Sequence, residues 1–384
     1  SQASASVTWS FRRTPPSDGW WRGLPQLAND PAYNPNLSLQ GPGYELDRLP
    51  RRRHADRPLV LAHPCDPFGC GNYRVYKPFQ ALVRAGRIQG SVHPGWPDLP
   101  ALARVSPDVH LLQRPTKDAR LAAAEGYRRH VRAFTVYELD DYLPGLPIGS
   151  AHRAEMPTDV RRMIRRGLGL ADRFVVSTHA LAETFAGWHA DIRVVENRLP
   201  VDWWGKLVRN RRDGARPRVG WAGGAGHGGD LALIADVVRA LAGEVDWVFF
   251  GMCPEALQPH LAEYHAGIEI SRYPAYLAQL DLDLAIAPLE DNQFNRCKSQ
   301  LRLLEYGACG YPVVCSDVHA FAEHGLPVTR VKNRFKDWVE AIRAHINDLD
   351  AAARAGDELR TAVLNGWMLE GENLEVWRRA WLPD

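Results

Sequence analysis

The chain has 384 residues, more than one hydrophobic core usually serves, so two domains of ordinary size are expected. Hydrophobic residues make up 45% and charged residues 24%, and no run of about 18 apolar residues exists to span a bilayer, which argues against a transmembrane protein. The first ten residues lack the pattern of a secretory signal. We therefore expect a cytoplasmic protein, with the inner membrane face as a place of peripheral contact.

The charge is distributed unevenly although the net value is only +2. Residues 1–212 carry +11 and residues 213–384 carry −9. A basic half favours an acidic partner such as a phosphorylated lipid, a membrane surface or nucleic acid. A solvated surface without a partner explains the same asymmetry.

The six cysteines are scattered without a C-x-x-C pair or a Cys/His zinc spacing. This pattern indicates reduced thiols rather than a disulfide framework. It predicts no structural metal.

The first half of the chain predicts an irregular extension over 1–56 and an α/β domain over 57–212. A buried strand at 59–62 is followed by a glycine-containing loop at 67–74 and a helix at 75–85. Further strands are expected at 109–112, 134–139, 174–177 and 192–195. Strands that alternate with helices imply a parallel sheet covered on both faces.

A second α/β cycle is predicted over 213–349, after a linker at 201–217, and a helical tail over 350–384. A strand at 218–222 enters the glycine-rich loop 223–230, and an apolar-periodic helix follows at 231–241. Strands are expected at 245–250, 268–270, 284–287 and 312–315, with a helix at 335–349.

The glycine-rich loop 223–230 has the composition of a phosphate-binding loop. Glycines between a strand and a helix let the backbone approach a phosphate, and the helix amino end offers free N–H groups. The loop matches neither G-x-x-x-x-G-K-[ST] nor a clean dinucleotide fingerprint, which weakens hydrolase and dehydrogenase interpretations. A tight turn without a ligand is the alternative.

The most informative segment is 288–314. A polar loop leads to a predicted helix start near Lys298 and Ser299, Glu305 lies about two turns inside, and Gly310 ends the helix. A carboxylate there can accept both hydroxyls of a ribose, while Lys298, Ser299 and the first N–H groups meet phosphate oxygens. The alternative is that Lys298 and Glu305 are surface charges on an amphipathic helix.

These residues resemble the GT-B glycosyltransferases, in particular the retaining group numbered family 4. Residues 294–316 are similar to the donor-site signature, with Lys-Ser at the helix start and Leu-Glu-Tyr before Gly-Ala-x-Gly-x-Pro-Val-Val. Weaker similarities cover 69–86, 136–141, 175–178, 195–200 and 219–231. The resemblance implies an α/β GT-B fold, in which two Rossmann-like domains with parallel sheets face each other across a cleft.

By this resemblance, Glu305 would bind the donor ribose and Tyr273 would contact the base. The diphosphate would be held by Lys298, Ser299 and the loop around Gly223, Gly224 and His227. Cys297 stands where the family has the first of two glutamates, so we expect sugar recognition to shift to Asp291, Asn292 or Asn295. The family's Arg and Lys phosphate pair after the glycine loop is missing, and His227 and Lys298 are expected to substitute.

Catalysis is expected from fixed positive charge, with Lys298 stabilising the departing diphosphate, and from Asp140 and Asp141 orienting or deprotonating the acceptor hydroxyl. Two adjacent aspartates after a strand can also form a helix cap or a solvated turn. Gly71, Asn72, Tyr73 and Arg74 would face the reacting phosphate or acceptor, although Arg74 also fits an ordinary surface arginine. Neither a metal nor another cofactor is expected.

The sequence therefore predicts a retaining, metal-independent glycosyltransferase that uses a nucleoside-diphosphate sugar. Its basic first domain would suit an acidic acceptor, such as a phospholipid-linked glycan. One alternative is a phage-type DNA glycosyltransferase that acts on hydroxylated bases. A second is a catalytically silent nucleotide-sugar-binding protein, which the missing first glutamate suggests.

Overall fold

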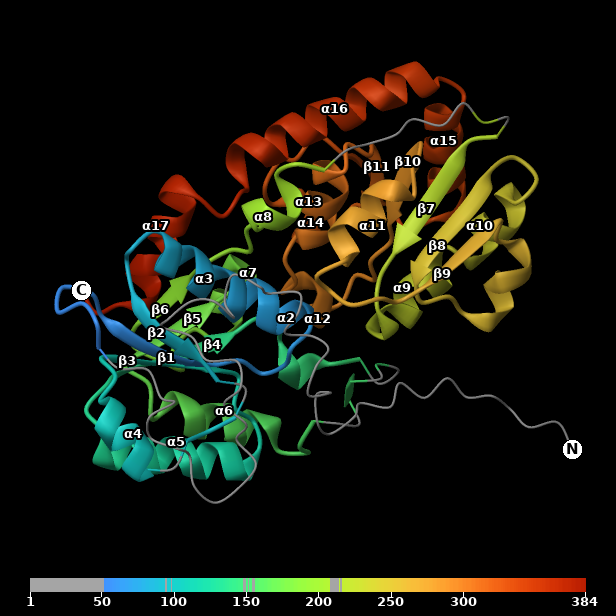
Figure 1. Ribbon diagram of the computed structural model, residues 1–384. Helices are drawn as coiled ribbons and strands as arrows, with labels where there is room; N and C mark the ends of the chain where they lie inside the picture. Colours follow the sequence, from blue (N-terminus) through green and yellow to red (C-terminus); the bar gives the residue numbers. More distant parts are fainter. Residues whose placement is uncertain are drawn as a thin grey trace, which may run out of the picture.

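The computed structural model describes residues 52–384, apart from residues 94, 98, 148–149, 151, 154–155, 208–213 and 215. The described chain forms two six-stranded sheets, and all paired strands in both are parallel (Figure 1). This confirms the predicted α/β class with two parallel sheets. The predicted extension over 1–56 lies almost entirely outside the described residues.

The first sheet has the order β2-β1-β3-β4-β5-β6. Its strands are β1 (Leu59–His63), β2 (Gln89–Val92), β3 (Val109–Gln113), β4 (Phe134–Leu139), β5 (Arg173–Val176) and β6 (Ile192–Val194). The helical segments around it are α2 (Gly69–Gly71), η3 (Asn72–Tyr76), α3 (Lys77–Arg84), α4 (Leu99–Val105), α5 (Asp118–His130), η4 (Leu143–Gly145), α6 (Val160–Leu168) and α7 (His179–Thr184). The order of the strands changes direction between β1 and β3, because β2 is added on one side of β1 and β3 on the other. Ligands of such sheets bind at this point, beyond the carboxyl ends of the strands.

The second sheet has the order β12-β11-β10-β7-β8-β9, and its strand order changes direction between β7 and β10. Its strands are β7 (Arg218–Ala222), β8 (Asp246–Gly251), β9 (Glu263–Ala266), β10 (Leu284–Ala287), β11 (Val313–Ser316) and β12 (Thr329–Val331). Its helical segments are α8 (Val201–Trp204), η6 (Ala225–His227), α9 (Gly228–Leu233), α10 (Ala235–Leu241), η7 (Glu255–His260), α11 (Tyr273–Gln279), α12 (Gln293–Arg296), α13 (Leu301–Ala308), α14 (His319–Ala322) and α15 (Phe335–Ile346). The loops after β7 and β10 are therefore the expected ligand-binding loops of this domain.

The carboxyl-terminal helices join the two domains. Helix α16 (Leu349–Gly366) packs on α13, and a side chain on Gly307 would lie 2.7 Å from Val363 and 2.9 Å from Leu359 of α16. Helix α17 (Gly371–Trp381) then packs on α3 (Figure 1). Its Trp377 and Trp381 are fully buried in the core of the first domain. Residues 350–384 therefore belong to both domains rather than forming a separate tail.

Several predicted elements differ from the structure. Strands β2 and β12 are not predicted, and the predicted strand at 268–270 is wrong, because the edge strand is β9. The helix that the sequence predicts at the donor site, α13, begins at Leu301 rather than near Lys298, because the backbone turns after α12, where the Cys297 carbonyl accepts a hydrogen bond from Thr178 of the first domain. Glu305 therefore lies about one turn, not two, inside α13.

No helix within the described ranges combines the length and apolarity that crossing a bilayer requires.

Candidate active site

The Glu305 carboxylate lies where the two domains meet. Tyr73 in η3 of the first domain donates its phenolic hydrogen to Oε1 at 2.8 Å, and Tyr273 at the start of α11 donates to Oε2 at 3.2 Å. The side chain is 6% exposed, and burial raises the pKa of Glu305 while Arg302 opposes that shift. A carboxylate has about four acceptor positions, so the two tyrosines leave acceptor capacity for other hydroxyls.

Tyr273 lies in an aromatic group beside this carboxylate. Its ring stacks on Phe250 at a centroid distance of 5.4 Å and meets Trp204 edge-on at 6.0 Å. The structure thus brings the predicted base contact and the predicted ribose contact together.

The loop after β7 approaches α13 closely. The amide of Gly223 donates to the carbonyl of Phe250 at 2.9 Å. A side chain at position 223 would lie 2.5 Å from the Trp221 ring and 2.8 Å from Nη1 of Arg302, so only glycine fits. A side chain on Gly224 would meet open space.

Arg302 is a candidate site residue that sequence reasoning missed. Its Nη1 is buried and has no hydrogen-bond partner within the described part of the chain, and it lies against Gly223 of the glycine loop. Its Nη2 approaches Nε2 of His227 at 3.3 Å. The available signal was its position four residues after Lys298 and three before Glu305, which places all three near one another at the start of a helix.

His227 is neutral in this structure, which argues against the prediction that it replaces a phosphate-binding cation. Burial, together with the charges of Lys298 and Arg302, lowers the pKa of His227 to about 4, although Asp230 opposes the shift. The neutral ring places Nδ1 at 2.7 Å from Oδ2 of Asp230, to which it donates, and Nε2 is left to accept from Arg302. His227 therefore positions Arg302 rather than supplying charge.

Lys298 lies in the turn before α13 with its ammonium 5.0 Å from the centre of the Phe294 ring. Among the described residues no carboxylate lies within ion-pair distance of Lys298. Its charge opposes the rise that burial causes in the pKa values of Asp141 and Glu290. The neighbouring Ser299 accepts a hydrogen bond from Nδ2 of Asn197 at 2.9 Å. Two cations, Lys298 and Arg302, are thus held at the amino end of α13 without a carboxylate bonded to either.

The predicted catalytic aspartates have different environments. Asp140 is buried at the end of β4, where its carboxylate lies 3.2 Å from Arg114, so a role as free base is not supported. Asp141 has no hydrogen bond or ion pair to its carboxylate from any described residue. Burial, and then the charge of Asp140, raise the pKa of Asp141, while Lys298 opposes the shift.

The donor atoms of Cys70, Asp140 and Asp141 lie within 4.8 Å of one another, the one such group found in the described ranges. Arg114 already supplies a cation to Asp140 there. The geometry alone assigns no metal to this group.

Of the loop predicted to face the reacting groups, only Tyr73 reaches across to the second domain. Gly71 packs closely on the backbone of Asp66, because a Cβ added at position 71 would lie 1.8 Å from the carbonyl oxygen of Asp66. Asn72 is buried and donates to the carbonyls of Pro67 and Phe68 at 2.9 Å. Arg74 is 1% exposed and bonds to Glu138, so the alternative of an ordinary surface arginine is wrong, and its bonded partners lie within the first domain.

The predicted sugar contacts are corrected in a similar way. Asn292 caps α12 by accepting from the Asn295 amide at 2.8 Å, and Asn295 itself is buried and donates to the Glu290 carbonyl at 3.0 Å. Both side chains hold the loop after β10 rather than projecting freely, whereas Asp291 is exposed.

The position of the missing glutamate is an apolar contact between domains. Cys297 is fully buried in the core cluster of the first domain, and its Sγ lies 3.4 Å from Oγ1 of Thr184 in α7. A glutamate would be buried against that helix. Another carboxylate that sequence reasoning missed is Glu290, which packs against Gly229 at the start of α9.

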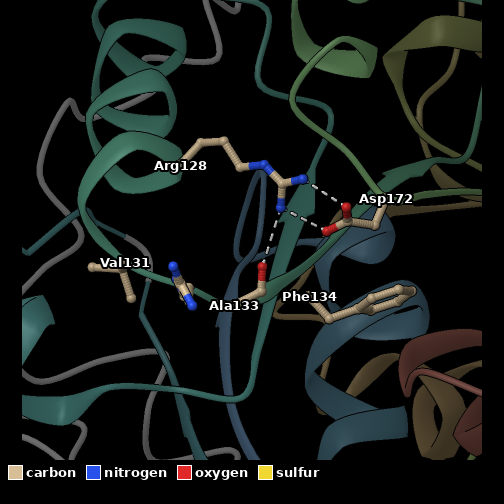
Figure 2. A pocket seen from close by; sticks show the side chains of 6 residues that line it. Arg128, Val131, Ala133, Phe134 and Asp172 are labelled. Atoms are coloured by element: carbon tan, nitrogen blue, oxygen red, sulfur yellow. Dashed lines mark hydrogen bonds and ion pairs between the residues drawn. The ribbon is translucent and has the colours of Figure 1, made fainter.

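A surface pocket lies elsewhere on the first domain (Figure 2). It is lined by Arg128, Val131, Arg132, Ala133, Phe134 and Asp172, and Arg128 donates to both oxygens of Asp172 at 2.7 Å. Phe134 begins β4 and Asp172 precedes β5, so the pocket is at the amino ends of the strands. This pocket is separate from the candidate site around Glu305, where the two domains meet.

Comparisons with known proteins give structural likeness only. No family model and no curated protein sequence matches the chain. Among solved structures, sucrose-phosphate synthase from Thermosynechococcus elongatus superposes with TM-score 0.58 at 13% identity, covering 84% of this chain and 98% of that one. HepE from Anabaena, in complex with UDP and glucose, gives TM-score 0.58 at 14% identity with the same coverage.

A third solved structure is an alpha-glucosyltransferase in complex with UDP and a 13-mer DNA that contains an HMU base. It gives TM-score 0.59 at 9% identity and covers 81% of this chain and 95% of that one. These likenesses confirm the fold that the sequence predicts.

Proposed function

We propose that this chain, which has the GT-B fold, is a retaining, metal-independent glycosyltransferase that moves a sugar from a nucleoside-diphosphate donor to an acceptor hydroxyl. One observation carries the proposal. At the amino end of α13, Lys298 and Arg302 have no bonded carboxylate among the described residues, and Glu305 lies one turn further on.

The donor diphosphate fits between the glycine loop and α13. Gly223 and Gly224 allow close approach, Nη1 of Arg302 is a buried donor in need of an acceptor, and Lys298 adds a second charge. An unsatisfied buried donor costs about 1–3 kcal/mol, so a phosphate oxygen there would be favoured. Two fixed cations would neutralise the leaving diphosphate, which is the reason for proposing that no divalent metal is needed.

The nucleoside fits beside Glu305. The two tyrosines occupy one acceptor position on each carboxylate oxygen, and the remaining positions suit the two ribose hydroxyls. Tyr273 and Phe250 would then lie close to the base. Uridine is the proposed nucleoside, because two of the structural neighbours hold UDP.

Transfer breaks the bond between the sugar anomeric carbon and the diphosphate oxygen and forms a bond to the acceptor oxygen, whose proton has to leave. Asp141 is the proposed acceptor of that proton, since its raised pKa makes it a stronger base than an ordinary aspartate. Glu290, near the diphosphate loops, is the proposed sugar contact in place of the missing glutamate.

The acceptor class has two candidates. A phospholipid-linked glycan and hydroxylated DNA both carry the negative charge that the basic first 212 residues would attract. One specific observation favours DNA as the second candidate, namely the likeness to the glucosyltransferase that was solved with DNA. Binding to duplex DNA that falls as salt rises would support DNA, and no binding at low salt would remove it.

The test of the proposal is UDP release from a panel of UDP-sugars, measured with lipid-linked and hydroxymethylated DNA acceptors. We expect release above background for the native chain, and a loss of about 10²–10³-fold in Lys298→Ala, because one fixed positive group at the leaving diphosphate is removed. Lys336→Ala on α15, whose side chain is 80% exposed, is the matched control and should leave the rate unchanged. Donor binding without any release would favour the catalytically silent alternative.

A further inference from the structure

A buried chain of hydrogen bonds runs from the first sheet to the donor-site helix. Arg74 donates from Nε to Glu138 at 2.6 Å and from Nη1 to Oδ1 of Asn197 at 3.0 Å. Asn197 in turn donates from Nδ2 to Oγ of Ser299 at 2.9 Å. The chain thus links η3 and β4, the segment after β6, and the turn that precedes α13.

Arg74 is held rigidly at the start of this chain. Its Nη1 also donates to the carbonyl of Val195 at 2.6 Å, and its guanidinium lies 4.5 Å from the centre of the Trp377 ring in α17. The side chain is 1% exposed and a guanidinium keeps its protons at any ordinary pH, so it can only donate.

This fixes the orientation of the Asn197 amide. Because Arg74 can only donate, the atom of Asn197 that faces it has to be the oxygen, and the amide NH₂ then faces Ser299. Asn197 is 7% exposed, so water does not compete freely for either end.

The orientation of Asn197 in turn sets the direction of the Ser299 hydroxyl. A hydroxyl has one hydrogen to donate, and the oxygen of Ser299 is already accepting from Asn197. Its hydrogen is therefore left to donate to another group, and Ser299 lies next to Lys298 at the site proposed for the donor diphosphate.

We infer that Arg74 and Asn197 are positioning residues that point the Ser299 hydroxyl hydrogen at a phosphate oxygen of the donor. This rests on the proposed function, and it adds a role for two side chains that touch no substrate. It also makes the first domain a contributor to donor binding, because Arg74 belongs to that domain and Ser299 to the second.

The test is a double-mutant cycle on UDP affinity, measured by calorimetry. Asn197→Asp keeps the shape of the side chain and still accepts from Arg74. Its carboxylate, however, accepts the hydrogen bond from the Ser299 hydroxyl, which then no longer points at the phosphate, so UDP should bind about tenfold more weakly. Ser299→Ala should cost about tenfold as well. If the chain acts as inferred, adding Ser299→Ala to Asn197→Asp costs nothing further or restores affinity, whereas independent effects would multiply to about 100-fold.

The controls separate this inference from its premise. Asn347→Asp at the exposed end of α15 makes the same change of charge and should leave UDP affinity unaltered. Asn197→Ala repeats the cycle without an added charge, in case the aspartate variant fails to fold. Effects that multiply, or a Ser299→Ala variant that binds UDP normally, would overturn only the positioning role of Arg74 and Asn197. A native chain that binds no UDP would overturn the proposed function as well.

Discussion

At the residue scale, the pairing of Arg302 with His227 explains how a positive charge can be kept beside the glycine loop. Asp230 fixes the neutral His227 ring, whose Nε2 accepts from Arg302 and holds the guanidinium in one direction. The opposite end of that guanidinium, Nη1, lies against Gly223. A preorganised donor of this kind loses little conformational freedom when a phosphate binds.

Replacing Arg302 should therefore weaken the binding of a nucleoside diphosphate. We expect Arg302→Ala to bind UDP about 10–100-fold more weakly, because a charge-assisted hydrogen bond is removed. Calorimetric titration measures the change. Arg296→Ala, in the neighbouring α12 and with a side chain 45% exposed, removes the same charge and should bind UDP normally; equal losses in both variants would show that only net charge matters.

Individual residues also show what a sequence can reveal about the site. Glu305, Lys298 and Gly223 are singled out because a helix start, a carboxylate and a glycine loop have recognisable spacings, and the structure places them around the start of α13. Asp140, Asn295 and Arg74 are misassigned because their partners, Arg114, Glu290 and Glu138, are distant in sequence or belong to loops of undetermined path. A sequence does not distinguish a polar side chain that hydrogen-bonds within the protein interior from one that binds a ligand.

At the scale of elements, apolar runs locate most strands, since a parallel sheet covered on both faces buries whole strands. The exceptions are the short strands β2 and β12, which contain polar residues or glycine. In β2, Gln89 bonds to the backbone of His54 and Arg57, which a hydrophobic pattern cannot indicate.

Three buried histidines lie together in the first sheet: His63 ends β1, His93 follows β2, and His110 is the second residue of β3. His63 stacks on Trp96 at a centroid distance of 4.5 Å, and His110 stacks on Tyr127 at 5.3 Å. Burial lowers the pKa of His63 to about 4 and the pKa values of His93 and His110 to about 3. All three rings are therefore neutral in the folded protein at neutral pH.

This cluster should make the first domain sensitive to acid. The unfolded chain binds a proton on each histidine near pH 6.5 while the folded chain does not, so stability falls as pH drops from about 6.5 toward 4. Each histidine should lower the free energy of unfolding by about 2 kcal/mol between pH 7 and pH 5. Denaturant unfolding of His110→Leu should show a smaller loss over that range than the native chain.

The matched control for this prediction is His130→Asn, at the exposed end of α5. It should keep the acid sensitivity of the native chain. An equal loss of stability in His110→Leu and the native chain would contradict the assignment to the buried cluster.

At the scale of the whole molecule, each domain core contains residues of the other. Tyr73 of the first domain packs in the core of the second, and Phe294 and Cys297 of the second pack in the core of the first. Helix α17 returns from the second domain to cover α3. The two domains and the general fold can be predicted from sequence, but this interlocking cannot, because it depends on contacts between segments up to about 300 residues apart.

The central claim is that a nucleotide donor binds at this junction with Glu305 on its ribose, and a comparison of UDP with 2′,3′-dideoxy-UDP tests it most directly. Calorimetry should show the native chain binding UDP at least about tenfold more tightly, because the dideoxy analogue leaves the buried Glu305 carboxylate without the two hydroxyls. In Glu305→Ala that preference should vanish. An equal preference in both proteins, or equal affinity of the native chain for both nucleotides, would contradict the account.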